Sequence, residues 1–387
     1  MFQIFEVIFW LVLVLIIYSF AGYPLILMLL DKILKPKQHV KIYDDKPKVS
    51  IIVPAHNEED VIKDKLNNLS QLDYPYNKVQ IIIASDNSND ETNNIVMNFI
   101  NNSDKNIKLY EVKERKGKTN AQNEAVRVAT GEFLIFTDAN SMLDKDAVTE
   151  LAAAFTEKDI MYVAGQLVYV NQLDNITSNS EATYWSYEMK LRDIESRLQA
   201  ITAGNGAVYA IRAKDYIDLP LIKSHDAGIP LESALRHKRS IFNKRAIAYE
   251  KAGETSGDEF NRKVRMFRSI LDTIFRKPQK YNVFKHKWFS FFYFSHRTLR
   301  ASSFLLHIVL LISNIYLSVF SGLYSVVLIF HISFYVLALL SRVFQSNNKL
   351  FYFPYYYTMT LMAQLTGAYK QLTGKSKPFW EKAESTR

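Results

Sequence analysis

The chain has 387 residues, which is long enough for more than one folding unit, and it carries a formal net charge of +9. It contains no cysteine, so disulfide bonds and thiolate metal sites are excluded. An excess of basic side chains suits nucleic acid or an anionic membrane surface, and the position of these side chains along the chain decides between the two.

The N-terminal segment is typical of a membrane anchor. Residues 7–30 carry no charge, and a bilayer core takes about 20 apolar residues. A cleaved signal peptide normally has basic residues before its apolar segment, whereas the only charged residue before residue 7 is Glu6. The run is followed by Lys32, Lys35, Lys37, Lys41, Lys46 and Lys48. The positive-inside rule then predicts that this flank is cytoplasmic. Since these basic side chains follow a membrane segment, we expect them to face a lipid bilayer, and we expect no nucleic acid as partner.

The C-terminal part repeats this pattern. Residues 301–340 carry no formal charge and would make about 60 Å of helix, twice a bilayer core, so a hairpin that turns at Ser321-Gly322 is expected. The aromatic stretch FYFPYYY (351–357) suits an interface better than a bilayer centre. The expected organisation is an anchor at 1–34, an α/β domain at 46–285, an interfacial basic and aromatic segment at 286–300, a transmembrane hairpin at 301–342, and an interfacial or re-entrant segment with a basic cytoplasmic tail at 350–387.

Between these segments, apolar runs alternate with helical patterns. Strands are expected at 49–55, 79–85, 107–112 and 132–139, and helices at 58–70, 89–100, 119–129 and 147–155. This alternation predicts an α/β fold with a mainly parallel sheet and helices on both faces.

Polar clusters follow three of the predicted strands. The first strand leads into Pro54-Ala55-His56-Asn57-Glu58, the second into Ser85-Asp86-Asn87-Ser88-Asn89-Asp90, and the fourth into Thr137-Asp138-Ala139-Asn140. Each cluster alone equally suits a helix cap or a turn. In open α/β sheets, however, ligands bind beyond the carboxyl ends of the strands, so the three together indicate a ligand site.

Two common nucleotide-binding motifs are absent from the sequence, and their absence narrows the chemistry of the site. The sequence has neither G-x-G-x-x-G after the first strand nor a P-loop, so a dinucleotide oxidoreductase and a P-loop enzyme are disfavoured. A diphosphate can instead be held by a divalent cation that bridges phosphate and carboxylate oxygens. Asp138 is placed to bind Mg²⁺ or Mn²⁺, and Asn140 can add a neutral oxygen.

These residues resemble the membrane-bound glycosyltransferases of family 2, which have the Rossmann-like GT-A fold, and in particular the bacterial branch of poly-N-acetylglucosamine and cellulose synthase-like enzymes. The resemblance is carried, in order along nearly the whole chain, by VSIIVPAHNEE (49–59), SDNSNDET (85–92), RKGKTNAQNEA (115–125), TDAN (137–140), GNGAVYAIR (204–212), HDAGIPLESAL (225–235) and FSHRTLR (294–300).

The resemblance implies a set of site residues. Asp226 holds the place of the general base, with Glu232 the next carboxylate to consider. The metal would be bound by Asp138 and Asn140. The nucleotide sugar would lie against Pro54, His56, Asn57, Glu58, Asp86, Asp90, Lys116, Lys118, Asn123, Asp138, Trp185, Gly204, Asn205, Gly206, Arg262 and Arg265. A solvated basic face is the alternative for the lysines, and core packing is the alternative for Trp185.

Two positions depart from the family pattern. Asn140 replaces the second acid of D-x-D, which puts the second metal ligand in doubt. The Q-x-x-R-W signature of processive members appears as Arg262-Lys263-Val264-Arg265-Met266, without its aromatic residue.

The expected function is a metal-dependent, inverting transfer of a sugar from a nucleotide sugar, UDP-linked, to a surface polysaccharide such as capsule or exopolysaccharide. The protein would be a multi-pass protein of the cell membrane with its catalytic domain in the cytoplasm. A glycan or a lipid-linked acceptor is implied, as is association with other proteins of polysaccharide synthesis or export. Two alternatives stay open: a non-processive transferase that acts on a lipid-linked intermediate, and an inactive nucleotide-binding scaffold.

Overall fold

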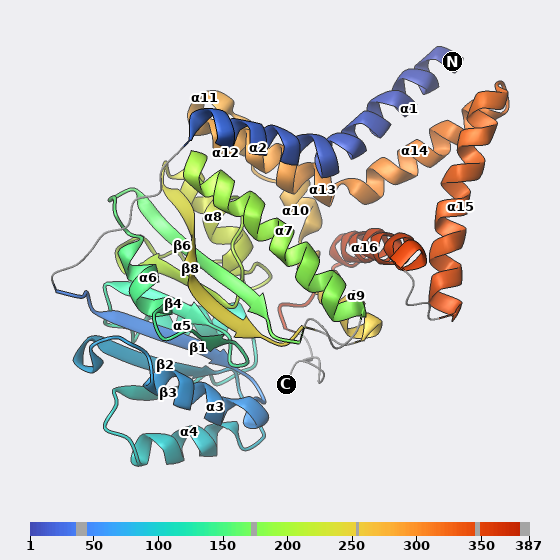
Figure 1. Ribbon diagram of the computed structural model, residues 1–387. Helices are drawn as coiled ribbons and strands as arrows, with labels where there is room; N and C mark the ends of the chain where they lie inside the picture. The colour runs from blue at the N-terminus through green and yellow to red at the C-terminus, as the bar shows by residue number, and fades with distance from the viewer. Residues whose placement is uncertain (36–44, 172–175, 253–254, 345–348, 380–387) are drawn as a thin grey trace. The chain divides into compact units, whose positions relative to one another are not determined.

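A computed structural model describes residues 1–35, 45–171, 176–252, 255–344 and 349–379 (Figure 1). These residues form two compact units. The helical unit comprises Met1–Leu29, Ser256–Pro278 and Tyr293–Ser376. The sheet unit comprises Leu30–Thr255, Gln279–Phe292 and the residues from Lys377 onward.

The sheet unit is built on a mixed eight-stranded sheet with strand order β3-β2-β1-β4-β7-β6-β8-β5. Strands β3, β2, β1 and β4 run parallel to one another, as do β6 and β8, whereas β7 and β5 pair antiparallel to their neighbours. The strands are β1 (Val49–Ala55), β2 (Val79–Ser85), β3 (Ile107–Glu111), β4 (Phe133–Thr137), β5 (Met142–Leu143), β6 (Ile160–Tyr169), β7 (Val208–Arg212) and β8 (Arg239–Glu250). The predicted α/β fold is confirmed, and the four-stranded half of the sheet from β3 to β4 is parallel throughout.

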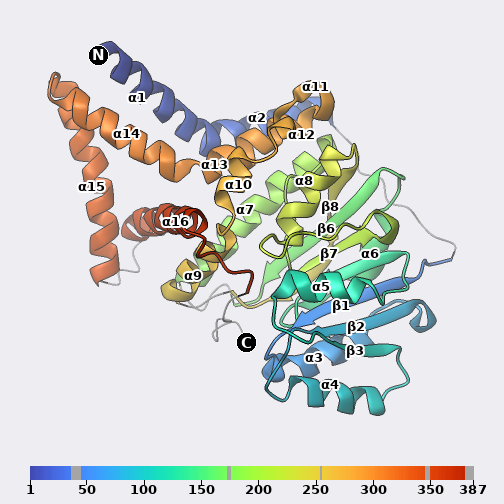
Figure 2. The ribbon, with the colours of Figure 1, turned by 180° about the vertical axis from the view of Figure 1, so that it is seen from behind.

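Helices cover both faces of this sheet. Figure 1 shows α7 in front of the strands, and Figure 2 shows α5 on the opposite face. The helices are α3 (Glu59–Ser70), α4 (Thr92–Asn101), α5 (Lys118–Val126), α6 (Ala147–Ala153), α7 (Ile176–Leu198) and α8 (His225–Leu235). Because both faces are covered, the central strands bury nearly every side chain, which explains their continuous apolar runs.

The carboxyl end of β1 pairs with fewer residues of β4 than of β2, so the last residues of the strand are free of β4. Strand β4 pairs with β1 as far as Ile52, whereas β2 pairs with it as far as Ala55. Pro54, which has no N–H to donate, therefore lies past the last β4 pair. The chain then turns sharply at Asn57, which has a φ of 54°.

Two helices of the described residues are long and apolar enough to cross a membrane, Phe2–Leu34 and Gly322–Phe344. The first consists of α1 (Phe2–Ile17), a π-helical turn (Tyr18–Gly22) and α2 (Tyr23–Leu34). A bent pair, Trp288–Ala301 and Ser303–Ser318, would be a third crossing if its two halves form one span. Helix α14 ends at Ser318 and α15 begins at Gly322, which is where the sequence predicts the turn of the hairpin.

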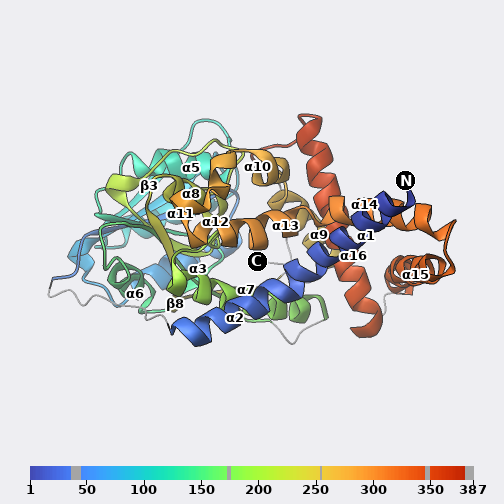
Figure 3. The ribbon, with the colours of Figure 1, turned by 90° about the horizontal axis from the view of Figure 1, so that it is seen from above.

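Helices α1 and α14 lie side by side (Figures 1 and 3). Phe9 and Val12 pack with Leu310, Leu317 and Tyr324. The remaining helices of the chain are α9 (Ser256–Met266), α10 (Ile270–Phe275), α11 (Val283–His286), α12 (Trp288–Phe292), α13 (Leu299–Ala301), α14 (Ser303–Ser318), α15 (Gly322–Phe344) and α16 (Lys349–Leu372). Helix α16 contains the aromatic stretch that the sequence assigns to an interface, and that assignment stays a prediction.

Candidate functional site

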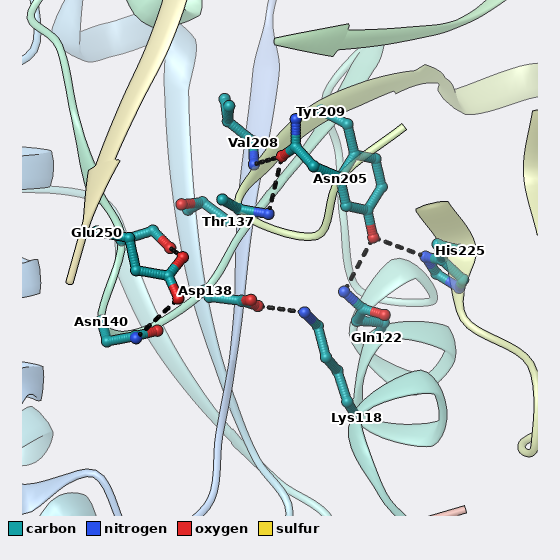
Figure 4. A network of polar contacts seen from close by, with 12 residues as sticks. Lys118, Gln122, Thr137, Asp138, Asn140, Asn205, Val208, Tyr209, His225 and Glu250 are labelled. Carbon is teal, nitrogen blue, oxygen red and sulfur yellow. Dashed lines mark hydrogen bonds and ion pairs between the residues drawn. The ribbon is translucent and has the colours of Figure 1, made fainter. Parts of the chain in front are cut away.

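The turn after β4 carries Asp138 and Asn140, and its main feature is a charge pair. Lys118, the first residue of α5, forms an ion pair with the Asp138 carboxylate (Figure 4). The two side chains are about a quarter exposed, at 25% and 28%. Gly206 lies against this pair, because a Cβ at that position would come within 3.0 Å of Lys118 Nζ and 3.5 Å of Asp138 Oδ2. A bound group can therefore reach both charges.

Asp86, at the end of β2, organises the neighbouring loop. Its two carboxylate oxygens accept the backbone N–H groups of Lys116 (3.0 Å) and Gly117 (2.7 Å), and the residue is 3% exposed. Gly117 has a φ of 94°, a conformation that favours glycine. His56 Nδ1 lies 2.8 Å from the Asp86 carbonyl oxygen, and burial lowers the pKa of His56. Asp86 thus fixes the loop that leads into Lys118.

The polar residues after β1 and β2 bind one another. Asn57 Oδ1 accepts the N–H of Asn89 (2.9 Å), and Asp90 accepts the N–H groups of Thr92 (3.0 Å) and Glu59 (3.2 Å). Burial opposes the ionisation of Asp90, but these hydrogen bonds prevail and lower its pKa. Glu58 is buried, and its N–H donates to Thr92 Oγ1 at 2.7 Å. These hydrogen bonds join the segment that follows β1 to the segment that follows β2.

A short glycine segment, Gly204-Asn205-Gly206, connects Asp226 to the charge pair. The Gly204 N–H donates to the Asp226 carbonyl oxygen (2.8 Å) at one end of the segment, and Gly206 faces Lys118 and Asp138 at the other. Two residues of extended chain span about 7 Å, so Asp226 lies within a sugar's reach of the pair.

Asn205 holds this segment in place. Its side chain donates to the Gly165 carbonyl (2.6 Å) and accepts the N–H groups of Ala207 and Val208 (both 3.1 Å), as Figure 4 shows in part. With 2% of its surface exposed, Asn205 shapes the turn into β7.

A buried network links the helices that carry Lys118 and Asp226 (Figure 4). Gln122 of α5 donates to the Tyr209 hydroxyl (3.0 Å), which in turn lies 3.0 Å from Nδ1 of His225, the residue before Asp226. Burial, reinforced by Lys118, lowers the pKa of His225 to about 3, so its imidazole is neutral. Asn123 belongs to the same network, since its side-chain oxygen accepts from the Tyr216 hydroxyl (2.7 Å). The network positions α8 against α5.

The residues fit one divalent cation that takes few protein ligands. In the described part of the chain, no three His, Asp or Glu side chains gather into a metal cluster. Asp138 is one carboxylate that already attracts a cation, the Lys118 ammonium. Mg²⁺ is commonly held by one or two carboxylates with substrate phosphates completing its shell, so this donor set suits a cation that arrives with a diphosphate.

The comparisons with known proteins agree with this geometry. Residues 50–218 match the model of the family described as Glycosyl transferase family 2. The segment from β1 to β7 is thus similar to family 2 glycosyltransferases. The chain is 39% identical over 105 residues to the Probable glycosyltransferase YdaM of Bacillus subtilis. It is 33% identical over 99 residues to the Poly-beta-1,6-N-acetyl-D-glucosamine synthase of Staphylococcus epidermidis.

These alignments cover only part of each protein. Both include 26% of this chain, and they span 25% and 23% of the length of the two relatives. A solved structure, the mannosyltransferase PcManGT from Pyrobaculum calidifontis in complex with GDP-Man and Mn2+, superposes with a TM-score of 0.71. That match covers 95% of this chain and 99% of the other at 20% identity, and it confirms the predicted GT-A fold.

Most of the predicted site residues come together at this edge of the sheet. Two groups have other surroundings. Trp185 is 8% exposed and packs in the main core, with the Arg192 guanidinium 5.2 Å from its ring centre. Arg262 and Arg265 belong to α9 of the helical unit, where Arg262 is paired with Glu259 (2.7 Å). Their contact with a donor stays a prediction.

Two residues that lie beside the Asp138 turn, Lys65 and Glu250, were not identified from the sequence. Lys65 is fully buried beneath the Asp138 turn, and burial lowers its pKa to about 7 while Asp138 and Glu250 oppose that shift. Glu250, the last residue of β8, binds Asn140 and Ser141. The signal for Lys65 was its helical spacing from Ile62 and Leu69, which puts a lysine on the apolar face of α3.

The glycine segment yields a test of the site's geometry. Gly204→Ala should lower the stability of the domain by about 1–3 kcal/mol, because the added Cβ would lie 2.0 Å from the hydroxyl oxygen of the buried Tyr162. Gly206→Ala should leave stability nearly unchanged, because its closest neighbour is the flexible end of Lys118. The melting temperatures of the two variants measure this, and equal losses would contradict the described packing.

Proposed function

We propose that this protein is an inverting glycosyltransferase that moves a sugar from a nucleotide sugar, UDP-linked, to a growing surface polysaccharide at the cytoplasmic face of the cell membrane. The observation that carries the proposal is the glycine segment, which has the Asp138–Lys118 pair at one end and Asp226 at the other. A transferase needs these two groups on either side of the reacting sugar: one for the leaving diphosphate and one for the acceptor.

The donor's diphosphate would lie at the first of these groups. Lys118 offers an ammonium to phosphate oxygens, and Asp138 with Asn140 would hold Mg²⁺ or Mn²⁺. The bound cation would neutralise charge on the leaving diphosphate. The PcManGT structure is a complex with GDP-Man and Mn2+, which supports divalent-cation use here and leaves the nucleotide to be tested. The loop fixed by Asp86 would bring Lys116 toward the same diphosphate.

Asp226 would act as the general base. It lies in the first turn of α8, and the hydrogen-bonded network under it holds that turn in place. From there its carboxylate would take the proton of the acceptor hydroxyl as that oxygen attacks the anomeric carbon. The attack comes from the side opposite the diphosphate, so a single displacement inverts the anomeric centre.

Transfer of a single sugar is the second candidate, and the residues of α9 favour it. Processive relatives place an aromatic residue after the arginine, whereas this chain has Met266, which is 52% exposed. A radiolabelled nucleotide sugar incubated with purified protein and Mn²⁺ separates the candidates. Long polymer supports the first candidate and a single lipid-linked product the second, whereas no transfer at all would contradict both.

The first prediction concerns the cation. Asp138→Asn should abolish transfer and weaken nucleotide-sugar binding, since a neutral side chain leaves the diphosphate charge without a bound cation. Wild-type protein in EDTA should behave in the same way and recover on addition of Mn²⁺. Transfer assays and calorimetric titration with UDP-sugars measure both effects. Full activity of the variant, or of wild type in chelator, would overturn the assignment of Asp138.

The second prediction concerns the base. Asp226→Asn keeps the shape of the side chain and removes its ability to accept a proton, so turnover should fall by about 10²–10⁴-fold. Donor binding should stay close to that of wild type, in contrast to Asp138→Asn. The two variants are compared by kcat and by titration with the donor. If Asp226→Asn turns over normally, the base is another carboxylate, and Glu232 is the next to replace.

The third prediction concerns orientation. Nucleotide sugars are cytoplasmic, and the lysines that follow the first apolar segment favour the same side for the sheet unit. Because the chain has no cysteine, the labelling of a single introduced cysteine reports on which side of the membrane that position lies. Asp104→Cys, beyond α4, should resist a membrane-impermeant thiol reagent in intact cells, and Ser321→Cys, before α15, should react. The reverse pattern would overturn the orientation.

A further inference from the structure

The turn that carries Asp138 and Asn140 is fastened to Glu250 at the end of β8. The Asn140 amide nitrogen donates to Glu250 Oε1 at 3.2 Å (Figure 4). The Ser141 hydroxyl donates to Glu250 Oε2 at 2.9 Å. Strand β5 extends this attachment, because Met142 pairs with Tyr249, the residue before Glu250. Both carboxylate oxygens of Glu250 are thus engaged by the metal-binding turn.

A second residue, the buried Lys65, binds both ends of the same turn. Lys65 of α3 is fully buried, and its ammonium donates to Thr137 Oγ1 at 2.9 Å and to the Ser141 carbonyl oxygen. Thr137 and Ser141 are the two ends of the turn. One buried side chain therefore fixes the separation of the ends between which Asp138 and Asn140 project.

These contacts account for an asparagine where the family pattern has an acid. A carboxylate has no proton to donate when ionised, so Glu250 requires the amide nitrogen of Asn140, and the amide oxygen then points away from it. An aspartate at position 140 would face Glu250 with two acceptors and no donor between them. Asp138 and Glu250 together supply two carboxylates, as many as D-x-D, and the second of them lies one hydrogen bond behind Asn140.

We propose that Glu250 is a positioning residue that orients Asn140 as a neutral oxygen ligand of the cation held by Asp138, and that Lys65 fixes the turn that presents both. This inference rests on the proposed function, since it assumes a cation at Asp138. It assigns to Glu250 and Lys65 a role in metal affinity that can be measured without any sugar transfer.

The first experiment measures Mn²⁺ affinity of the full chain in detergent by electron paramagnetic resonance. Glu250→Gln should weaken Mn²⁺ binding by about 10- to 100-fold, the usual effect of losing an outer partner of a metal ligand. The double variant Asn140→Asp, Glu250→Gln keeps the net charge and reverses the hydrogen bond, because the glutamine now donates to the aspartate. It should recover most of the lost affinity.

The chain offers a matched control in Glu150→Gln. Asn243 of β8 donates its amide nitrogen to Glu150 Oε2 at 3.2 Å, the same chemistry and distance as Asn140 with Glu250. This variant should bind Mn²⁺ as wild type does. An equal loss in Glu150→Gln, or a folded double variant as weak as Glu250→Gln, would overturn the inference.

Lys65→Met separates positioning from charge by the sign of its effect. Loss of a positive charge beside Asp138 would by itself strengthen cation binding, whereas loss of the two hydrogen bonds to the turn would weaken it. The inference predicts weaker Mn²⁺ binding in a protein that still folds, with a lowered melting temperature because the Thr137 hydroxyl and the Ser141 carbonyl lose their buried donor. Tighter or unchanged binding would overturn the role of Lys65.

The two levels of proposal fail in different ways. Wild-type protein that does not bind Mn²⁺ would refute the metal part of the proposed function, and this inference with it. Wild-type protein that binds Mn²⁺ while Glu250→Gln and Lys65→Met bind equally well would refute this inference alone. If Glu250→Gln does not fold, the double variant is compared directly with wild type, and loss of its Mn²⁺ binding in a folded protein refutes the inference.

Discussion

A charged side chain can be buried in a protein only where an opposite charge or a hydrogen-bonding partner lies beside it, and this constraint organises the carboxyl edge of the sheet. Asp86 is buried because two backbone N–H groups of one loop bind its carboxylate. Lys65 is buried because the turn after β4 offers it a hydroxyl and a carbonyl oxygen. In each case the partner belongs to a segment that also carries a site residue. Satisfying the buried charges therefore places the site.

The groups proposed for the chemistry are mounted on the ends of helices. Lys118 begins α5, and Asp226 lies in the first turn of α8, where a carboxylate is favoured by the helix dipole. The two helices are connected through Gln122, Tyr209 and His225, all of which are buried. A site on rigid elements holds its geometry better than one on loops, so the spacing of Asp226 and Lys118 is set by packing.

The helical unit meets the same constraint in apolar surroundings. Tyr324 donates to Glu6 Oε1 at 2.8 Å and accepts from Trp10 Nε1 at 3.0 Å, which joins α1 to α15. His307 of α14 lies 2.8 Å from the Tyr335 hydroxyl and 2.9 Å from that of Tyr357. Between apolar helices, where hydrophobic contact does not discriminate one register from another, such polar contacts select the partners.

The sequence by itself determined the order of the elements. Continuous apolar runs such as VSIIVPA predict strands buried on both faces, and the observed β1 and β2 have the predicted bounds. The first four strands appear in the predicted order, and the polar clusters after them meet at one edge because parallel strands end on the same side. Asp138 was recognisable because it directly follows a strand, whereas Asp226 and the glycine segment were proposed from the family resemblance.

Tertiary structure decided the partners of those residues. The antiparallel β7 inside the sheet, the pairing of β8 with β5, and the meeting of Asn140 with Glu250 join residues that are roughly 70 to 110 positions apart in the sequence. Lys65 and Glu250 look like surface residues when read locally, since lysine and glutamate are rarely buried. Local patterns report which face of an element is apolar, but whether a single charge on that face is tolerated depends on which distant group folds against it, and only the packed structure supplies that group.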